Sequence, residues 1–154
     1  MTTGNGRRGI SLRGLFTPER LVVLLSVAVI LVVFWPRVTD SVYALRSQHA
    51  IDAAEKIFAA VERLEDESEE PVVSAGEELQ FFAPDIPDFL ALGPDPEGPV
   101  LGDFLEEGDL FTVTQINWYG AGDDDYVLVV DFRGAYGRYR RCEIRPEGPE
   151  WVGR

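Results

Sequence analysis

One carboxylate stands out among the residues that could do chemistry in this chain. Glu19 comes two residues before residues 21–35, a run that is apolar except for Ser26. A carboxylate beside so apolar a helix is costly at membrane depth, so Glu19 is expected to need a partner there. The alternative is local: Thr17 would be an N-cap, Pro18 the first helical residue and Glu19 a favourable first-turn acid.

Groups for covalent or redox chemistry are scarce. The single Cys142 excludes an intramolecular disulfide and a zinc site built on several cysteines. The single His49 lies among apolar residues and is predicted to be packed and hydrogen-bonded rather than a ligand. The sequence has no nucleophile motif, phosphate loop or metal cluster. We therefore expect neither an enzyme nor a bound cofactor.

A short acidic segment is the one place where a metal ion could bind. Asp123, Asp124 and Asp125 could offer oxygen ligands to Ca²⁺, with Asp131 as a further donor. The segment lacks the spacing of an EF-hand loop. Because Asp and Gly also favour tight turns, a turn between two strands is the preferred explanation of the same residues.

A basic strip follows near the carboxyl end. It could contact DNA, pair with acids of a neighbouring subunit, or protect an edge strand. Bulk nucleic-acid binding is not expected, because the chain has a formal net charge of −13 and a pI near 4.4. The strip consists of Arg138, Arg140, Arg141 and Arg145.

A membrane-spanning helix is the first element that these residues require. At about 1.5 Å per residue, residues 15–36 would span roughly 33 Å, enough for the hydrocarbon core of a bilayer. The positive-inside rule keeps the amino end in the cytoplasm and predicts that everything after Pro36 is exported. The basic residues on the amino side are Arg7, Arg8, Arg13 and Arg20.

The same helix is predicted to continue to about Leu64 with an amphipathic pattern. Its second half carries an apolar stripe at steps of three and four, and it should end in the acidic run before Pro71. The stripe consists of Val38, Val42, Leu45, His49, Ala53, Ile57, Val61 and Leu64.

The rest of the chain is predicted to be a loop followed by a small antiparallel sheet. Residues 72–109 are rich in Pro and Gly, with hydrophobic anchors and room for one short helical turn. Three strand-like runs follow at residues 110–119, 126–132 and 138–145, and the third is expected at an edge. Trp151 is a further expected anchor. With 154 residues, this gives one α+β domain, its sheet packed on the amphipathic half of the helix.

The segment RGLFTPERLVVLLSVAVILVVFWP, residues 13–36, resembles the amino terminus of type IV pilins and of type II secretion pseudopilins. Precursors of that family have a short basic leader ending in Gly, a hydrophobic first mature residue, Glu at mature position five and a long apolar helix. Here Gly14 would end the leader, Leu15 would be the first mature residue, Glu19 the fifth and Pro36 the twenty-second. Pro18 and Arg20 stand where apolar residues are usual.

The resemblance implies a basic leader at residues 1–14, a transmembrane and filament-core helix at 15–36, and an exported pilin-like head at 37–154. A prepilin peptidase would cut between Gly14 and Leu15 and methylate the new amine. Glu19 would pair with the amino terminus of a neighbouring subunit in a helical filament, after storage in the bacterial inner membrane. The alternative is a single-pass, signal-anchored binding or sensor module, exported but without a filament role.

Overall fold

We describe a computed structural model of the chain over residues 18–68, 71–122, 125–135 and 137–153. Two compact units divide the chain between Asp40 and Ser41. The described part of the first unit, residues 18–40, is called the stem. The second unit, from residue 41 onward, is called the head. Each is described by itself, and the helix that contains the division is α1 (Pro18–Asp66).

The stem is a continuous stretch of α-helix in which polar side chains are satisfied locally. The Ser26 hydroxyl donates to the carbonyl oxygen of Val22 at 2.8 Å, and the Thr39 hydroxyl donates to that of Pro36 at 2.7 Å. Such bonds hide hydroxyls in apolar surroundings. Pro36 lies inside the helix and has no N–H to donate to the carbonyl of Val32.

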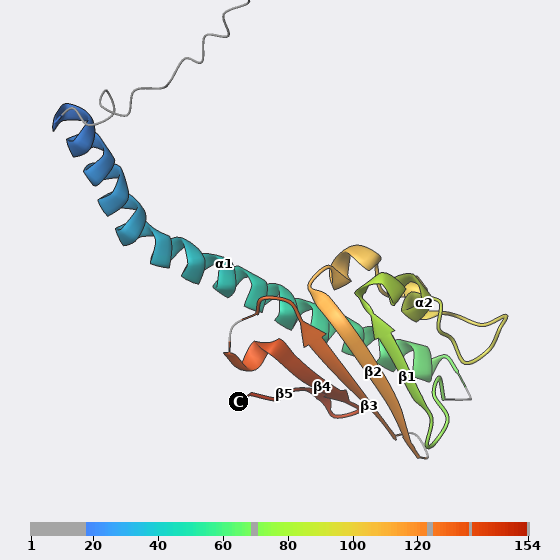
Figure 1. Ribbon diagram of the computed structural model, residues 1–154. Coiled ribbons are helices and arrows are strands. Elements are labelled where there is room, and N and C mark those ends of the chain that lie inside the picture. Colours follow the sequence, from blue (N-terminus) through green and yellow to red (C-terminus); the bar gives the residue numbers. More distant parts are fainter. Residues whose placement is uncertain (1–17, 69–70, 123–124, 136, 154) are drawn as a thin grey trace, which may run out of the picture. The chain divides into compact units, whose positions relative to one another are not determined.

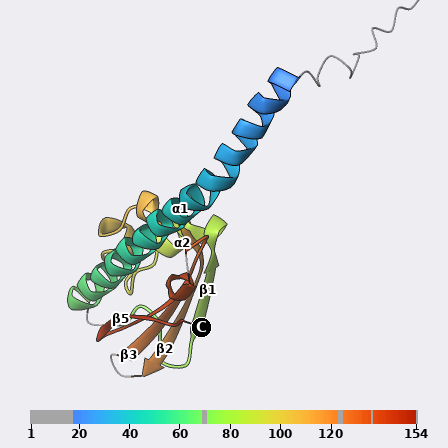
Figure 2. The same ribbon diagram turned by 90° about the vertical axis from the view of Figure 1, so that its left-hand side faces the viewer.

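In the head, α1 continues to Asp66 and packs on one face of a sheet (Figures 1 and 2). Its buried face consists mainly of small residues, which let a helix approach a sheet closely. The Ser68 hydroxyl donates to the carbonyl of Leu64 at 2.7 Å and so satisfies one of the carbonyls left free at the helix end. The buried residues are Ser47, Ala50, Ala53, Ala54, Ile57, Ala60, Val61 and Leu64.

The sheet is a five-stranded antiparallel meander in which neighbours in sequence are neighbours in space. Its inner face and α1 form the core, which includes Trp118, Leu128, Val130, Cys142 and Ile144. Alternating burial along β3 is the pattern expected of a strand covered on one face. The strands are β1 (Glu78–Phe82), β2 (Val113–Gly122), β3 (Asp125–Phe132), β4 (Arg141–Arg145) and β5 (Gly148–Trp151).

The α+β arrangement of a long helix on a small antiparallel sheet is confirmed, whereas several details of the sequence prediction are wrong. Residues 72–109 are not all loop, because β1 lies there. The third predicted strand begins at Arg141 rather than residue 138, since residues 137–140 form the 3₁₀-helix η5 (Gly137–Arg140). It also does not lie at an edge, because β5 pairs with its outer side.

The predicted apolar stripe is correct only in its second half. Ala53, Ile57, Val61 and Leu64 are buried, whereas Val38, Val42 and Leu45 remain 57%, 42% and 59% exposed. The residues that α1 buries nearer its entry to the head are instead Ser47 and Ala50. The sheet begins to cover the helix only there, so the early part of the stripe has no covering surface in the head.

The connection between β1 and β2 is folded against the core by its hydrophobic anchors. It contains α2 (Ile86–Leu90) and the 3₁₀-helices η2 (Ala83–Asp85), η3 (Leu101–Asp103) and η4 (Glu107–Leu110). Phe89, Leu101 and Leu105 are buried, as predicted for anchors. Asp85 and Asp103 each accept a hydrogen bond from a backbone N–H three residues earlier, at 3.1 and 2.9 Å. These bonds fix the two turns.

Candidate functional site

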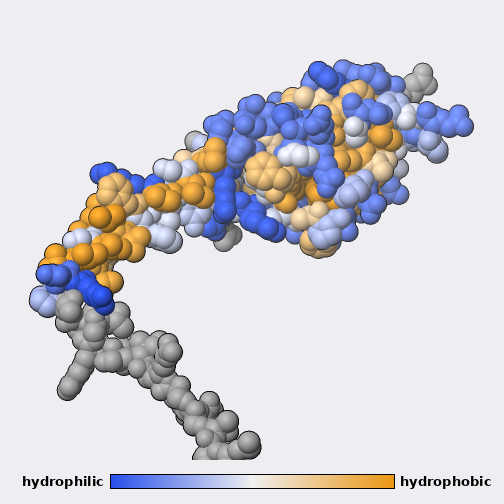
Figure 3. All heavy atoms as spheres, turned by 90° about the horizontal axis from the view of Figure 1, so that it is seen from above, coloured by the Kyte–Doolittle hydropathy of each residue, from blue (hydrophilic) through white to orange (hydrophobic). Residues whose placement is uncertain are grey.

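The stem presents apolar side chains on all sides. Every residue from Pro18 to Val38 is exposed, and the large apolar ones range from 43% exposed at Leu21 to 73% at Val32. On the face shown in Figure 3, hydrophobic side chains cover much of this part of α1, whereas the head is mostly hydrophilic with apolar areas between. A helix that is apolar all round needs a surrounding that is equally apolar.

Glu19 lies in the first turn of α1 as the described helix begins. It is exposed, and with Arg20, Val23 and Leu24 it lines a shallow hollow of about 350 Å³. A carboxylate here is favourably placed toward the positive end of the helix dipole. The geometry therefore offers an accessible anion at the edge of an apolar surface. Gly14 and Leu15, the predicted processing site, lie outside the described residues.

Length and composition make α1 able to cross a bilayer, as the apolar run predicted. The most apolar part of the helix is not buried in the protein at all. A signal sequence near an amino terminus meets the same criterion. This supports a single-pass membrane anchor or signal anchor and leaves the direction of insertion as a prediction.

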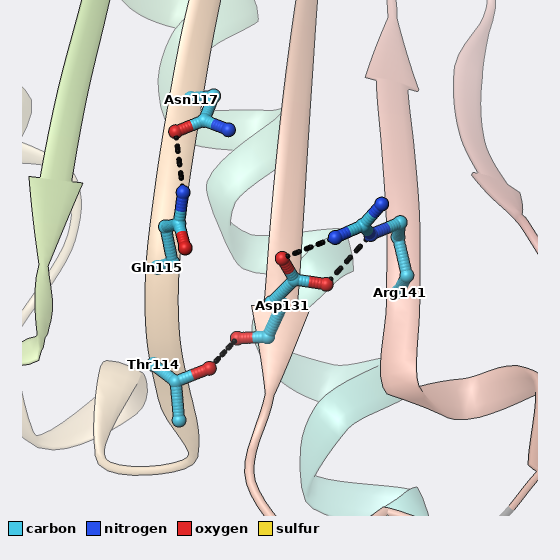
Figure 4. Close-up of polar contacts among 5 residues, drawn as sticks. All are labelled: Thr114, Gln115, Asn117, Asp131 and Arg141. Atoms are coloured by element: carbon cyan, nitrogen blue, oxygen red, sulfur yellow. Dashed lines mark hydrogen bonds and ion pairs between the residues drawn. The ribbon is translucent and has the colours of Figure 1, made fainter.

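The face of the sheet that α1 does not cover carries an ordered set of polar pairs (Figure 4). Arg141 on β4 forms a bidentate ion pair with Asp131 on β3, with N–O distances of 2.7 and 2.8 Å. The side-chain amide of Gln115 donates to Asn117 at 2.9 Å on β2. The ion pair raises the pKa of Arg141, first through its hydrogen bond to Asp131.

The predicted arginine strip is divided by the structure. Arg141 and Arg145 share the open face of β4, and Arg145 pairs with Glu143 at 2.9 Å. Arg140 precedes the strand in η5, and its Nε donates to the carbonyl of Ala135 at 3.4 Å. The backbone of Arg138 also lies in η5. Arg141 and Arg145 are thus matched by carboxylates. The Arg141 pair joins β4 to β3, whereas the Arg145 pair lies within β4.

The predicted aspartate group is described only in part. Asp125 is exposed at the start of β3 and pairs with Gly122 across the hairpin. Asp123 and Asp124 lie outside the described residues. Among the residues that are described, no group of three or more His, Cys, Asp or Glu side chains is arranged to hold a metal ion. Ca²⁺ binding stays a prediction. Asp131, the further donor considered, is the partner of Arg141.

Two groups that could be reactive are held in packed surroundings. Cys142 is completely buried, and burial raises the pKa of its thiol to about 12, which keeps it protonated near neutral pH. His49 is half-buried, with its ring edge against Phe111 at a centroid distance of 4.9 Å. The buried, protonated thiol of Cys142 is unlike an activated nucleophile, which needs a lowered pKa.

Sequence reasoning missed a mixed apolar and basic surface at the end of the head where α1 enters it. Phe111 is 64% exposed there, next to Arg133, whose backbone N–H donates to the carbonyl of Thr112 at 2.7 Å. Phe111 looked like part of a strand because it continues an alternating run. Its exposure follows from β2 beginning only at Val113.

Comparison with known proteins adds no relative: no family model, curated protein or solved structure matches the chain significantly.

Proposed function

We propose that this protein is a structural subunit of a type IV pilus-like or type II secretion pseudopilus filament. The observation that carries the proposal is Glu19 at the start of a helix whose apolar side chains are exposed on every side. Such a surface needs two covers in succession, a bilayer before assembly and neighbouring helices after it. The α+β head, a helix packed on a meander sheet, agrees with the resemblance of residues 13–36.

In this function the stem is the assembling part. Helices packed side by side would bury the apolar surface, and Glu19 would be stable in that environment only beside an opposite charge. The freed amino terminus of a neighbouring subunit, created by cleavage after Gly14, would supply that charge. The pair would form at one axial stagger and would thereby set the register between subunits. The head would face outward with its acidic surface.

The amino-terminal state of the protein from its own host is the first test. We expect the membrane and filament forms to begin at methylated Leu15, read by intact mass and amino-terminal sequencing. Retention of residues 1–14 in the membrane form would sink the filament proposal and favour the signal-anchored binding or sensor module.

A charge-neutral substitution tests the role of Glu19 separately. We expect Glu19→Gln to be cleaved and inserted normally but to lose most filament assembly, measured as sheared filament mass. Glu55→Gln removes an exposed carboxylate from the head portion of the same helix and should assemble as the parent does. Equal assembly of both variants would remove Glu19 from the mechanism.

A further inference from the structure

A surface that combines apolar and basic residues lies where α1 enters the head, and we call it the basal surface. It consists of Val42, Leu45, Arg46, Phe111, Arg133, Arg140 and Val152. Leu45 and Phe111 are 59% and 64% exposed. Among the described residues of the head, exposed large apolar side chains occur at this end and not at the opposite one.

Contacts between three segments hold the basal surface together. The ring of Phe111 meets His49, one turn of α1 beyond Leu45. The backbone N–H of Arg133 bonds to Thr112, next to Phe111. Gly134, with φ of +66°, lies so close to the Arg46 guanidinium that a Cβ there would collide with it. The surface therefore belongs to the folded head and not to a loose tail.

Arginines gather at this end of the head, although the head as a whole is acidic. Residues 41–154 hold 9 basic and 25 acidic residues, a balance of −16, yet the basal surface itself carries arginines. Exposed carboxylates lie near it as well: Glu107 lines a hollow beside Phe111, Asp52 follows His49 by three residues on α1, and Glu150 precedes Val152 by two. Asp131 is already paired with Arg141. At the opposite end lie Glu62, Glu65, Asp66, Glu67, Glu77, Glu78, Asp125 and Glu147.

The acidic end is too distant to cancel the basal charge in physiological salt. From Arg46 to Glu62 is sixteen residues of α1, or about 24 Å. The Debye length at physiological ionic strength is about 8 Å, so these carboxylates are screened from anything that touches the basal surface.

We propose that the basal surface docks the head onto an anionic phospholipid bilayer. A bilayer interface offers anionic phosphates to the arginines and an apolar boundary to Phe111, Leu45 and Val42. The acidic end of a second copy would offer charge but no exposed large apolar residue, so it fits only half of the surface. This inference rests on the membrane anchoring proposed above and not on filament assembly.

The test uses the full chain in lipid nanodiscs, with an environment-sensitive dye on Phe111→Cys. Because Cys142 is buried with a raised pKa, a maleimide should react with the new surface thiol, and the parent chain serves as a labelling blank. Flotation first verifies insertion, so that a failure of anchoring is distinguished from a failure of docking. A nitroxide on the lipid headgroup then quenches a dye that lies at the membrane surface.

We expect strong quenching in discs containing phosphatidylglycerol and at least twofold less in pure phosphatidylcholine or at high salt. A dye on Ala75→Cys, at the exposed turn near the acidic end, should not be quenched in either. One arginine beside an anionic membrane shifts the equilibrium between the undocked and the docked head about fivefold toward the docked state. Arg133→Gln should therefore lower the quenching that depends on anionic lipid, whereas Arg63→Gln, near the acidic end, should not.

Two results would overturn the proposal. The first is equal quenching in anionic and zwitterionic discs after verified insertion. The second is protection of the dye only when a disc holds two copies of the chain, independent of lipid charge, which would assign the surface to a neighbouring subunit.

Discussion

The stem and the head treat apolar side chains in opposite ways, although helix α1 runs through both. The stem exposes large residues such as Val32 and Trp35, whereas the head buries small ones such as Ala50 and Ala54 on the same helix. The difference teaches that hydrophobicity alone does not determine burial. A side chain is buried where a second surface is available, and among the described residues only the head supplies one.

The largest expected effect comes from making the stem resemble a solvated helix. The apolar residues of 21–35 favour insertion by roughly 4–8 kcal/mol, and each aspartate near the helix centre costs about 2.5–3.5 kcal/mol. We expect Val27→Asp with Ile30→Asp to cancel most of this and to release the protein on carbonate extraction. Val27→Leu with Ile30→Leu is the matched control. Continued integration of the aspartate variant would contradict a membrane-spanning stem.

One tryptophan in each region allows the stem and the head to be compared directly. Trp118 is 1% exposed in the core, and Trp118→Ala should lower the free energy of unfolding of the head by about 3–5 kcal/mol. Trp118→Phe should cost less, because the buried indole N–H has no partner among the described protein groups. Trp35 is 66% exposed in the stem, and Trp35→Ala should leave the head unchanged. Urea unfolding of the full chain in detergent, followed by near-UV circular dichroism, measures all three.

A smaller effect probes the close approach of α1 to the sheet. Ala54 is fully buried, so Ala54→Leu should destabilise the head by about 1–3 kcal/mol through overpacking. Ala59 is exposed on the same helix, and Ala59→Leu should change stability by less than about 0.5 kcal/mol. The same urea titration applies. Equal effects would mean that the helix does not pack on the sheet through its alanines.

The smallest effect is an alkaline loss of stability specific to the head. Burial raises the pKa of Cys142 from 9.0 to about 12, so the folded state holds its proton more tightly than the unfolded state does. This contribution is complete well below pH 9 and is lost as pH rises from 9 to 12, by at most about 1.4 kcal/mol at pH 10. Burial and the nearby Glu65 also raise the pKa of Tyr126, which adds a loss above pH 10.

The measurement is the difference in unfolding free energy between pH 8 and pH 10. Cys142→Ala should show a smaller difference than the parent chain. The cost of losing the side chain is the same at both pH values, so it drops out of this comparison. An unchanged difference would mean that the thiol does not titrate differently on folding.

Periodicity predicted the long helix and its approximate end because both depend on local pattern. The predicted end near Leu64 lies two residues from the observed end at Asp66. Trp151 is an anchor, as expected, with its ring 5.7 Å from that of Phe132 and 5.2 Å from that of Tyr139. These features follow from side-chain chemistry that neighbouring residues do not override.

Strand β1 and the position of β4 could not be predicted in the same way. β1 is five residues long with two adjacent phenylalanines, and it becomes a strand by pairing with β2. Arg138 and Arg140 suggested that both faces of the last strand were polar. Once the strand begins at Arg141, its inner face holds Cys142 and Ile144, both fully buried. The later start leaves Arg138 and Arg140 in η5, outside the strand, so they no longer count toward its inner face.

The candidate site also has one part that the sequence predicts and another that depends on the tertiary structure. Glu19 and the apolar run were evident from the sequence because their meaning depends on composition and spacing. The pairing of Asp131 with Arg141 depends on the register between β3 and β4, which brings together residues ten positions apart. The basal surface depends on three segments meeting, and none of them is unusual alone.

The sequence by itself therefore determined the long helix, its apolar first half, the acidic balance and the α+β class, since each is a sum over local properties. The tertiary structure alone decided that the small residues of α1 are buried while Val42 and Leu45 are not, that β4 is an inner strand, and that Phe111 lies beside Arg133. The physical reason is that burial and strand pairing each depend on two segments that meet in space, whereas a local sequence pattern describes only one segment.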